Sequence, residues 1–158
     1  MHYLVTGHTG FKGAWLTLML KEQGHTVSGL ALEPAAGSLY ERVHLSDLLR
    51  HDLRADIRDA GATRRAISTV EPDVVLHLAA QPLVRESYRD PRYTYETNTM
   101  GTLSVLEAVE HTPSVKAQVI ITTDKVYSPG SRVRAPRSRP PLPERATSSE
   151  VVTSVPTD

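Results

Sequence analysis

The first candidate site is a turn with three regularly spaced glycines, Gly7, Gly10 and Gly13, in the segment GHTGFKG. This spacing suits a pyrophosphate: the first glycine permits a tight turn, the second lets the backbone approach the phosphates, and the third lets the next helix lie close to the sheet. The N–H groups of Phe11, Lys12 and Gly13 would face the phosphates at the positive end of the helix dipole. The same glycines also suit a purely structural turn. Nucleotide binding is favoured because an apolar strand precedes the turn and an apolar helix follows it.

The residues alone leave open whether the dinucleotide is NAD or NADP. An acidic residue commonly holds the ribose hydroxyls at the end of the second strand, near Ala31 in this chain. Ala31 is not acidic, Glu33 comes two residues later and precedes Pro34, and no basic pocket for a 2′-phosphate is evident. Lys12 also has two interpretations, a phosphate contact or a solvated surface charge.

The strands and helices that position this turn are predicted by alternating strand-like and helix-like patterns over residues 1–127. Strands are predicted at 3–5, 26–31, 51–55, 74–79 and 119–122, and helices at 11–23, between Asp59 and Pro72, and from Pro91 onward. The nearly all-apolar run 74–79 is typical of a central parallel strand covered on both faces. The alternation predicts an α/β fold with a doubly wound, Rossmann-like parallel sheet, truncated after about five strands.

Length and composition exclude several classes of protein. The 158 residues suit one domain, and 18 Lys plus Arg against 18 Asp plus Glu argue against binding of nucleic acid through phosphate attraction. No apolar run approaches the roughly 20 residues that span a bilayer, and the N-terminus does not resemble a signal peptide. The absence of cysteine excludes disulfides, thiol catalysis and cysteine-based zinc sites. We expect a soluble, cytoplasmic protein with no metal and no nucleic-acid or membrane partner.

Composition changes abruptly at residue 128, so residues 1–127 and 128–158 are predicted to be two unlike parts. The second part holds six of the eleven prolines and only five large apolar side chains. Burying five such side chains stabilises by about 15 kcal/mol at most, whereas fixing the backbone costs about 30–60 kcal/mol. We expect a disordered C-terminal tail, and we hypothesise that a shift of reading frame near residue 128 produced it.

Three further stretches, residues 55–59, 77–82 and 97–102, follow the glycine turn in an order that resembles a known family. The chain is similar to the extended short-chain dehydrogenase/reductases, the NAD-dependent sugar-nucleotide epimerases and dehydratases. Residues 7–16, 79–85 and 122–127 narrow the resemblance to the 4,6-dehydratases of the CDP-glucose type. The similarity covers residues 1–127 and implies NAD as the cofactor.

The resemblance implies a role for each matching position. Asp56 would accept a hydrogen bond from the adenine amine, with the backbone of Ile57 beside it, and Asn98 would support the hydrogen-bond network of the active site. Four residues would line the cofactor past the fourth strand: Leu78, Ala79, Ala80 and Gln81. The alternatives are a turn cap for Asp56, tight core packing for the two alanines, and an exposed polar residue for Asn98. His77 is interpreted as a core histidine rather than a catalytic one.

The catalytic candidates implied by the resemblance are Thr123, Asp124 and Lys125, which follow the last predicted strand. In such dehydratases the hydroxyl contacts the sugar 4-oxygen, and the next two residues assist the loss of water from carbons 5 and 6. A carboxylic acid can protonate the leaving hydroxyl, and a lysine can act as base or stabilise the enolate. The implied reaction is oxidation at carbon 4 by NAD, elimination, and return of the hydride to carbon 6. The alternative is a strand-end turn with a solvated charge pair.

One part of the family's catalytic machinery has no counterpart. The family requires a Tyr followed four residues later by Lys, but no lysine follows Lys125 and no tyrosine follows Tyr127. We therefore expect an inactive, truncated form of a dehydratase whose substrate, if the chain were completed, is a sugar nucleotide such as CDP-glucose. Three alternatives stay open: an NDP-sugar epimerase, a non-catalytic NAD-binding module, and an interaction fragment whose unpaired sheet edge forms a homo-oligomer.

Overall fold

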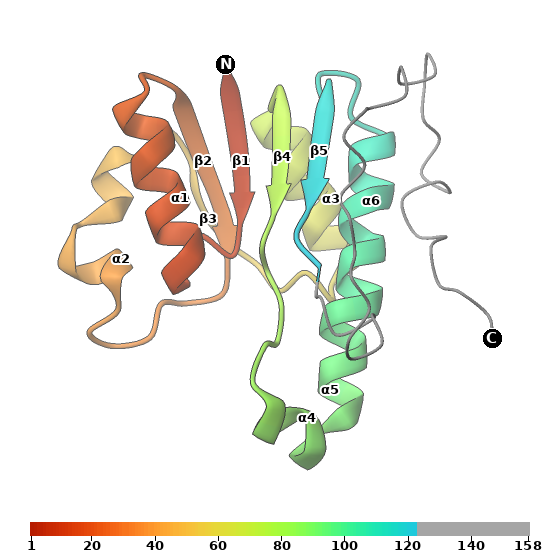
Figure 1. Cartoon of the computed structure of the whole chain (residues 1–158). Helices are drawn as coiled ribbons and strands as arrows, with labels where there is room; N and C mark the ends of the chain where they lie inside the picture. The colour runs from red at the N-terminus through yellow and green to blue at the C-terminus, as the bar shows by residue number, and fades with distance from the viewer. Residues whose placement is uncertain (123–158) are drawn as a thin grey trace, which may run out of the picture. The chain divides into compact units, whose positions relative to one another are not determined.

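A parallel sheet runs through the part of the chain that the computed structural model describes, residues 1–122 (Figure 1). Its five strands, from edge to edge, are β3 (Asp52–Arg54), β2 (Thr26–Ala31), β1 (His2–Thr6), β4 (Val74–His77) and β5 (Ala117–Ile120). β1 and β4 are hydrogen-bonded neighbours although two strands separate them in the sequence, so the strand order reverses between them. In open α/β sheets, ligands bind outside the carboxyl ends of the strands at such a switch point.

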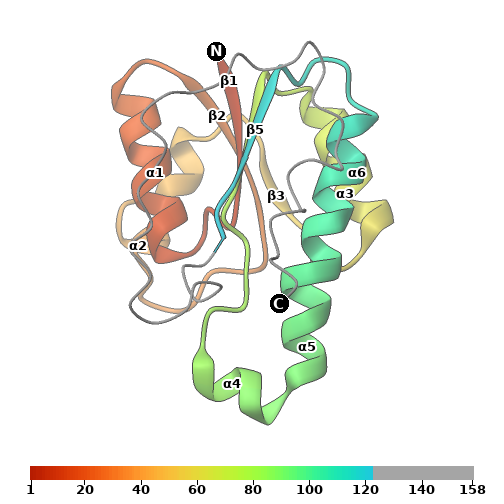
Figure 2. The ribbon, with the colours of Figure 1, turned by 45° about the vertical axis from the view of Figure 1, so that its right-hand side comes forward.

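Helices cover both faces of this sheet (Figure 2). One face carries α1 (Phe11–Glu22) and α2 (Leu39–Arg42), and the other carries α3 (Ala60–Val70) and α6 (Thr102–Glu110). The remaining helical turns are η1 (Leu45–Leu48), α4 (Val84–Arg89), α5 (Pro91–Tyr95) and the π-helical turn η2 (Glu96–Gly101). Within residues 1–122, no helix combines the length and the apolar character needed to cross a bilayer.

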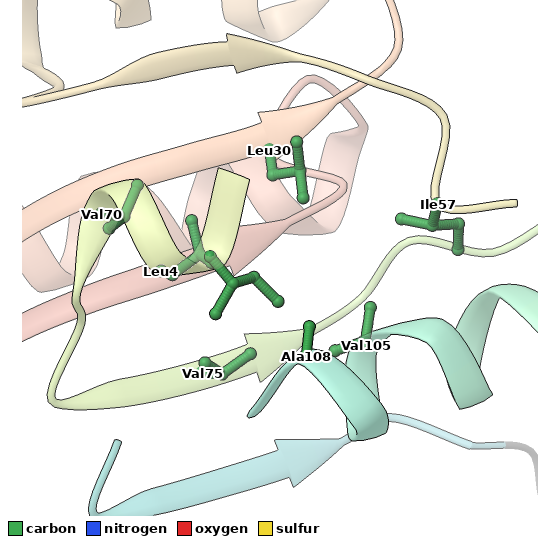
Figure 3. Close-up of a cluster of buried hydrophobic side chains, with 8 residues drawn as sticks. Leu4, Leu30, Ile57, Val70, Val75, Val105 and Ala108 are labelled. Carbon is green, nitrogen blue, oxygen red and sulfur yellow. The ribbon is translucent and has the colours of Figure 1, made fainter. Parts of the chain in front are cut away.

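β1 contributes to two cores because successive side chains of a strand point to opposite faces of the sheet. Leu4 points toward α3 and α6, where it joins a buried apolar cluster (Figure 3). The other members of this cluster are Leu30, Ile57, Ile67, Val70, Val75, Val105 and Ala108. Val5 points to the opposite face, where it packs with Leu20 of α1. The sheet is therefore fixed between two apolar layers, and its carboxyl edge is left to the loops.

The predicted alternation of strands and helices is confirmed. β2 has the predicted limits, α1 begins at Phe11, and α5 begins at Pro91, as expected. Asp59 caps α3, and its carboxylate accepts a hydrogen bond of 2.9 Å from the N–H of Ala62. The fold class, a Rossmann-like parallel sheet, is therefore the one predicted.

Three strand ends were predicted too late, that of β3 by one residue, and three short helical segments were missed. β5 ends at Ile120 and β4 ends at His77, each two residues before the predicted end. After His77 the Leu78 N–H is shared between the carbonyl and the hydroxyl of Thr6, at 3.2 and 3.1 Å, and the Ala79 N–H donates to the same hydroxyl at 3.2 Å, which ends the regular strand pairing of β4. The missed segments are α2, η1 and α4. The expected tail, residues 128–158, lies outside the described residues.

Truncating Leu4 tests the assigned core. Leu4 is completely buried, so Leu4→Ala leaves a cavity and should lower the free energy of unfolding by about 2–5 kcal/mol. Urea unfolding followed by circular dichroism measures this loss. The matched control is Leu32→Ala, at a side chain that is 50% exposed, which should change stability by about 0.5 kcal/mol or less. Equal losses in the two variants would contradict the assignment.

Candidate dinucleotide-binding site

The glycine turn leaves the carboxyl end of β1 and touches the loop after β4. Gly7 has φ of +75°, in the left-handed region that favours glycine, and its N–H donates to the carbonyl of Leu30 at 2.8 Å. A Cβ at Gly7 would lie 2.8 Å from the backbone nitrogen of Ala79. The two loops at the switch point are thus in direct backbone contact.

The start of α1 depends on the other two glycines. A Cβ at Gly13 would lie 2.2 Å from the carbonyl oxygen of Gly7, so only glycine lets the helix approach the turn this closely. Gly10 is the N-cap and offers no side chain to the N–H groups of the first helical turn. Those N–H groups have no carbonyl partner within the helix and form an anion-binding end. Phe11 and Lys12 are exposed beside it.

A buried polar cluster fixes the second residue of the turn, His8. Its imidazole, 0% exposed, fits against β2 only because a Cβ at Gly29 would lie 2.3 Å from the His8 ring. Nε2 of His8 lies 2.7 Å from Oδ1 of Asp52, which also accepts from Arg54 at 2.5 Å, while the Tyr40 hydroxyl donates to Oδ2. Burial lowers the pKa of His8, which favours the neutral ring. The cluster therefore ties the glycine turn to the ends of β2 and β3.

Sequence reasoning missed this cluster. Its five members come from four separate stretches of the chain, at residues 8, 29, 40 and 52–54. Neither their spacing nor their residue types give a local pattern. The one available signal was a histidine, His8, inside the glycine turn. This signal predicts a buried ring only once it is known that Gly29 of β2 lies opposite His8.

Two neighbouring residues, Asn98 and Gln81, hold the loop after β4. The N–H of Gln81 donates to Oδ1 of Asn98 at 2.7 Å, and Nδ2 of Asn98 donates back to the Gln81 carbonyl at 3.1 Å. The Gln81 side chain is turned into its own loop, where it donates to the Thr94 hydroxyl and accepts from the Leu83 N–H. Asn98 thus uses both ends of its amide to fix a backbone, and Ala80 is exposed next to it.

The loop after β3 contains Asp56 and Ile57. Asp56 accepts hydrogen bonds from the backbone N–H of Arg58 at 3.0 Å and from its guanidinium at 2.6 and 2.9 Å. The Arg58 side chain, chiefly, lowers the pKa of Asp56, so this carboxylate is charged at neutral pH. Ile57 is buried against η2, since a Cβ at Gly101 would lie 2.6 Å from its Cδ1. Gly101 thereby sets how closely the loop approaches the helix.

The structure brings some of the expected site residues together and leaves others untested. The three glycines and Ala79 meet at the β1–β4 switch point. The loop that contains Asp56 packs on η2 through Ile57, and Asn98 lies in η2 and holds the loop after β4. An open cavity of about 360 Å³ lies elsewhere, between Tyr95 and Met100, and contains none of them. The expected catalytic residues, Thr123, Asp124 and Lys125, lie outside the described residues.

A parallel sheet of this order, with a glycine turn between β1 and α1, defines a Rossmann-like dinucleotide-binding fold. The chain belongs to the NAD dependent epimerase/dehydratase family, whose model matches residues 3–149. The family resemblance is therefore confirmed. The match continues past residue 127, where we expected the family-like sequence to end, and that boundary stays a prediction.

Individual relatives are longer than this chain. It is 48% identical over 139 residues to CDP-glucose 4,6-dehydratase from Salmonella typhimurium, which covers 87% of this chain and 38% of the relative. It is 33% identical over 112 residues to GDP-mannose 4,6-dehydratase from Vibrio cholerae, covering 67% of this chain and 30% of that protein. The chain thus spans well under half the length of the curated relatives it matches.

Solved structures show the same fold. UDP-glucose-4-epimerase from Stenotrophomonas maltophila, with bound NAD, matches with a TM-score of 0.69 and 29% identity over 80% of this chain and 38% of that one. The Thermus thermophilus UDP-glucose 4-epimerase complex with NAD has a TM-score of 0.64 and 33% identity, over 74% and 36% of the two chains.

Alanine should cost more stability at Gly13 than at Gly10. Gly13→Ala forces a Cβ into the Gly7 carbonyl and should lower the free energy of unfolding by about 1–3 kcal/mol. Gly10→Ala meets the same carbonyl at 3.3 Å and should cost about 1 kcal/mol or less. Urea unfolding of both variants measures the difference. A Gly13→Ala variant as stable as the wild type would refute the close approach of α1.

His77 should make stability depend on pH. The ring is 2% exposed, and burial lowers its pKa to about 4 from the usual 6.5. The folded state then resists protonation, so this contribution is fully present above pH 6.5 and is lost as the pH falls toward 4. At about 1.4 kcal/mol per pH unit, the loss from His77 reaches about 3 kcal/mol.

Urea unfolding at several pH values tests this contribution, with His77→Asn as the control in which the slope between pH 6.5 and 4 becomes shallower. NMR titration of the His77 ring protons gives a direct second measurement. Titration near pH 6.5 would show that the ring is not held neutral by burial.

Proposed function

We propose that residues 1–122 form the NAD-binding part of a sugar-nucleotide 4,6-dehydratase of the CDP-glucose type. The observation that carries this proposal is the bare glycine turn, which leaves the N-terminus of α1 free of side chains at the β1–β4 switch point. The 48% identity to a CDP-glucose 4,6-dehydratase supports the substrate class.

The glycine turn suits the diphosphate of NAD. Phe11, Lys12 and Gly13 provide the N–H groups of the first turn of α1, and these can donate to phosphate oxygens. Gly7 and Gly10 expose backbone rather than side chain on the same turn, which lets the diphosphate approach closely. The exposed ammonium of Lys12 adds a positive charge nearby.

The charges around β3 favour NAD over NADP. The Arg54 guanidinium donates to Asp52 and lies 3.4 Å from the Glu33 carboxylate, so its charge is already matched by two acids. The Asp56 carboxylate, whose charge Arg58 already matches, would also accept a hydrogen bond from the adenine amine, with the backbone of Ile57 beside it. Net negative charge at this end suits ribose hydroxyls and repels an additional phosphate.

Four residues that follow β4 would line the cofactor: Leu78, Ala79, Ala80 and Gln81. The support is their position after the carboxyl end of β4, where Ala79 meets Gly7. When bound, NAD supplies an acceptor for the hydride from a sugar carbon. The chain's own contribution is to hold that loop still, through the Asn98 amide on the backbone of Gln81.

Catalysis by this chain would depend on residues after β5. We assign the sugar hydroxyl contact to Thr123, the acid to Asp124 and the base or enolate contact to Lys125, with Asn98 supporting their network. No Tyr-x-x-x-Lys pair occurs within residues 1–158, so we expect this 158-residue chain by itself to bind NAD without turning over CDP-glucose. We further propose that residues 1–127 are the functional part of the chain and that residues 128–158 are a tail of different composition.

The chain is also proposed to form a homo-oligomer in the cytoplasm. Among the described strands, β5 pairs with β4 alone, and its other edge offers backbone groups to a second subunit, which supports a homo-oligomer. We also propose a cytoplasmic location, because the chain has no cysteine and so cannot form the disulfides that are common in oxidising compartments.

An NDP-sugar epimerase is the second candidate. It is favoured by the two solved neighbours described above, both of which are UDP-glucose 4-epimerases with bound NAD. The higher identity to a dehydratase, 48% against 29% and 33%, supports the first candidate.

Calorimetric titration of the full chain tests NAD binding. We expect saturable binding of NAD, with at least about tenfold weaker binding of NADP because of the charge at β3. Gly10→Ala should keep its fold by circular dichroism and lose about tenfold in NAD affinity, since its methyl group stands before the phosphates. Incubation with CDP-glucose and NAD should give no 4-keto-6-deoxy product.

Each of these three measurements has an outcome that would contradict the proposal. No heat and no thermal shift with NAD would remove the binding proposal. Equal affinity in Gly10→Ala would move the site away from the glycine turn. Measurable product would overturn the prediction that the chain lacks turnover.

A further inference from the structure

A row of polar groups, buried at Thr6 and His77 and half-buried at Thr102, joins the end of β1 to the helix on the other side of β4. The Thr6 hydroxyl lies 2.7 Å from Nδ1 of His77, and Nε2 of His77 lies 3.1 Å from the hydroxyl of Thr102. The Thr102 hydroxyl in turn donates to the carbonyl of Asn98 at 2.8 Å. We name Thr6, His77, Thr102 and Asn98 the threonine–histidine row. Its four members come from β1, β4, α6 and η2.

Counting donors fixes the direction of every hydrogen bond in the row. A carbonyl only accepts, so the single proton of Thr102 is used on Asn98, and Nε2 of His77 must donate to Thr102. Thr6 accepts the N–H groups of Leu78 and Ala79, so its own proton goes to Nδ1 of His77. The ring is therefore the neutral tautomer with its proton on Nε2.

Only a neutral imidazole satisfies both ends of this row. It offers one acceptor and one donor on opposite sides of a rigid ring. A protonated ring would present a third donor to the Thr6 hydroxyl, which already receives two backbone N–H groups. His77 is 2% exposed, so water cannot easily replace a lost partner.

Both ends of the row reach the loop that the proposed function places against NAD. At one end Thr6 holds the N–H of Ala79, whose backbone touches Gly7. At the other end Asn98, in the π-helical turn η2, holds the N–H and the carbonyl of Gln81. The loop 79–81 is thus held from two sides, and the row connects the two holds.

We propose that His77 is a positioning residue that couples these two holds, so that the glycine turn and Asn98 fix the loop 79–81 as one unit. This inference rests on the proposed NAD site for its functional consequence, but the coupling itself exists in the chain without NAD. The buried Thr112, two residues past the end of α6, donates to the Ala108 carbonyl at 2.8 Å in the same way as Thr102 does to Asn98, but among the described residues its hydroxyl has no hydrogen bond to a histidine ring.

Thr102→Val breaks the row while keeping the side-chain shape, and Thr102→Ser restores the hydroxyl. The matched control is Thr112→Val, which removes an equivalent hydroxyl near the end of the same helix. In the NAD-free chain, amide hydrogen exchange at Ala79 and Gln81 should accelerate about tenfold in Thr102→Val and stay within about twofold of wild type in the other two variants. NAD affinity should follow the same order, with a loss of about five- to twentyfold in Thr102→Val alone.

Combining Thr102→Val with His77→Asn tests whether the two act together. In His77→Asn the new amide can reach Thr6 but is too short to reach Thr102. Amide exchange at Ala79 and Gln81 should therefore be no faster in the double variant than in His77→Asn alone. Long-range ¹H–¹⁵N spectra of the wild type should show the His77 proton on Nε2.

Unchanged exchange at Ala79 and Gln81 in Thr102→Val, or a proton on Nδ1 of His77, would overturn the inference whether or not NAD binds. Equal effects of Thr112→Val and Thr102→Val would also overturn it, because the effect would then be a general loss of stability. Failure of the wild type to bind NAD would count against the proposed function and would leave the exchange result to decide the coupling.

Discussion

Direct contact between backbones is the constraint on which the rest of the site depends. Gly13 brings α1 onto the carbonyl of Gly7, and Gly7 brings the same turn onto the backbone of Ala79. Each contact leaves no room for a Cβ, so three segments meet at the switch point without any side chain between them. The free N–H groups at the start of α1 are aimed by this packing, because the helix cannot tilt away without opening the contact. Phosphate binding at a helix N-terminus needs that kind of fixed direction.

Glycine has a second use in this fold, as the socket for a larger residue. Gly29 makes room for the His8 ring, and Gly101 makes room for Ile57. In both cases a residue of a site-forming loop is pressed into an element of the sheet or of a helix. Loops at the carboxyl edge of a sheet are otherwise free to move. Here they are anchored by sockets and by buried hydrogen bonds, which is how a nucleotide site can be formed before its ligand arrives.

The two buried histidines carry out related tasks on opposite sides of β1. His8 ties the glycine turn to β2 and β3, and His77 ties β1 and β4 to the helix that contains Asn98. Burial lowers the pKa of both, so both serve as neutral hydrogen-bonding groups rather than as charges. The interpretation of His77 as a core histidine agrees with its 2% exposure, although its two ring nitrogens give it a more specific role than packing.

The amino-acid sequence was enough to predict the alternation of strands and helices, the glycine turn and the family, because these depend on local periodicity and on motifs within a few residues. It also located Asp59 as a cap and Pro91 as a helix start, since both act on their own neighbours. It misjudged the end of β4, where Thr6, 72 residues earlier, captures the N–H of Leu78. The folded chain was needed to find the sockets at Gly29 and Gly101, the cluster around Asp52 and the tautomer of His77. Those features arise from contacts between segments far apart in the chain, whose distances no local pattern encodes.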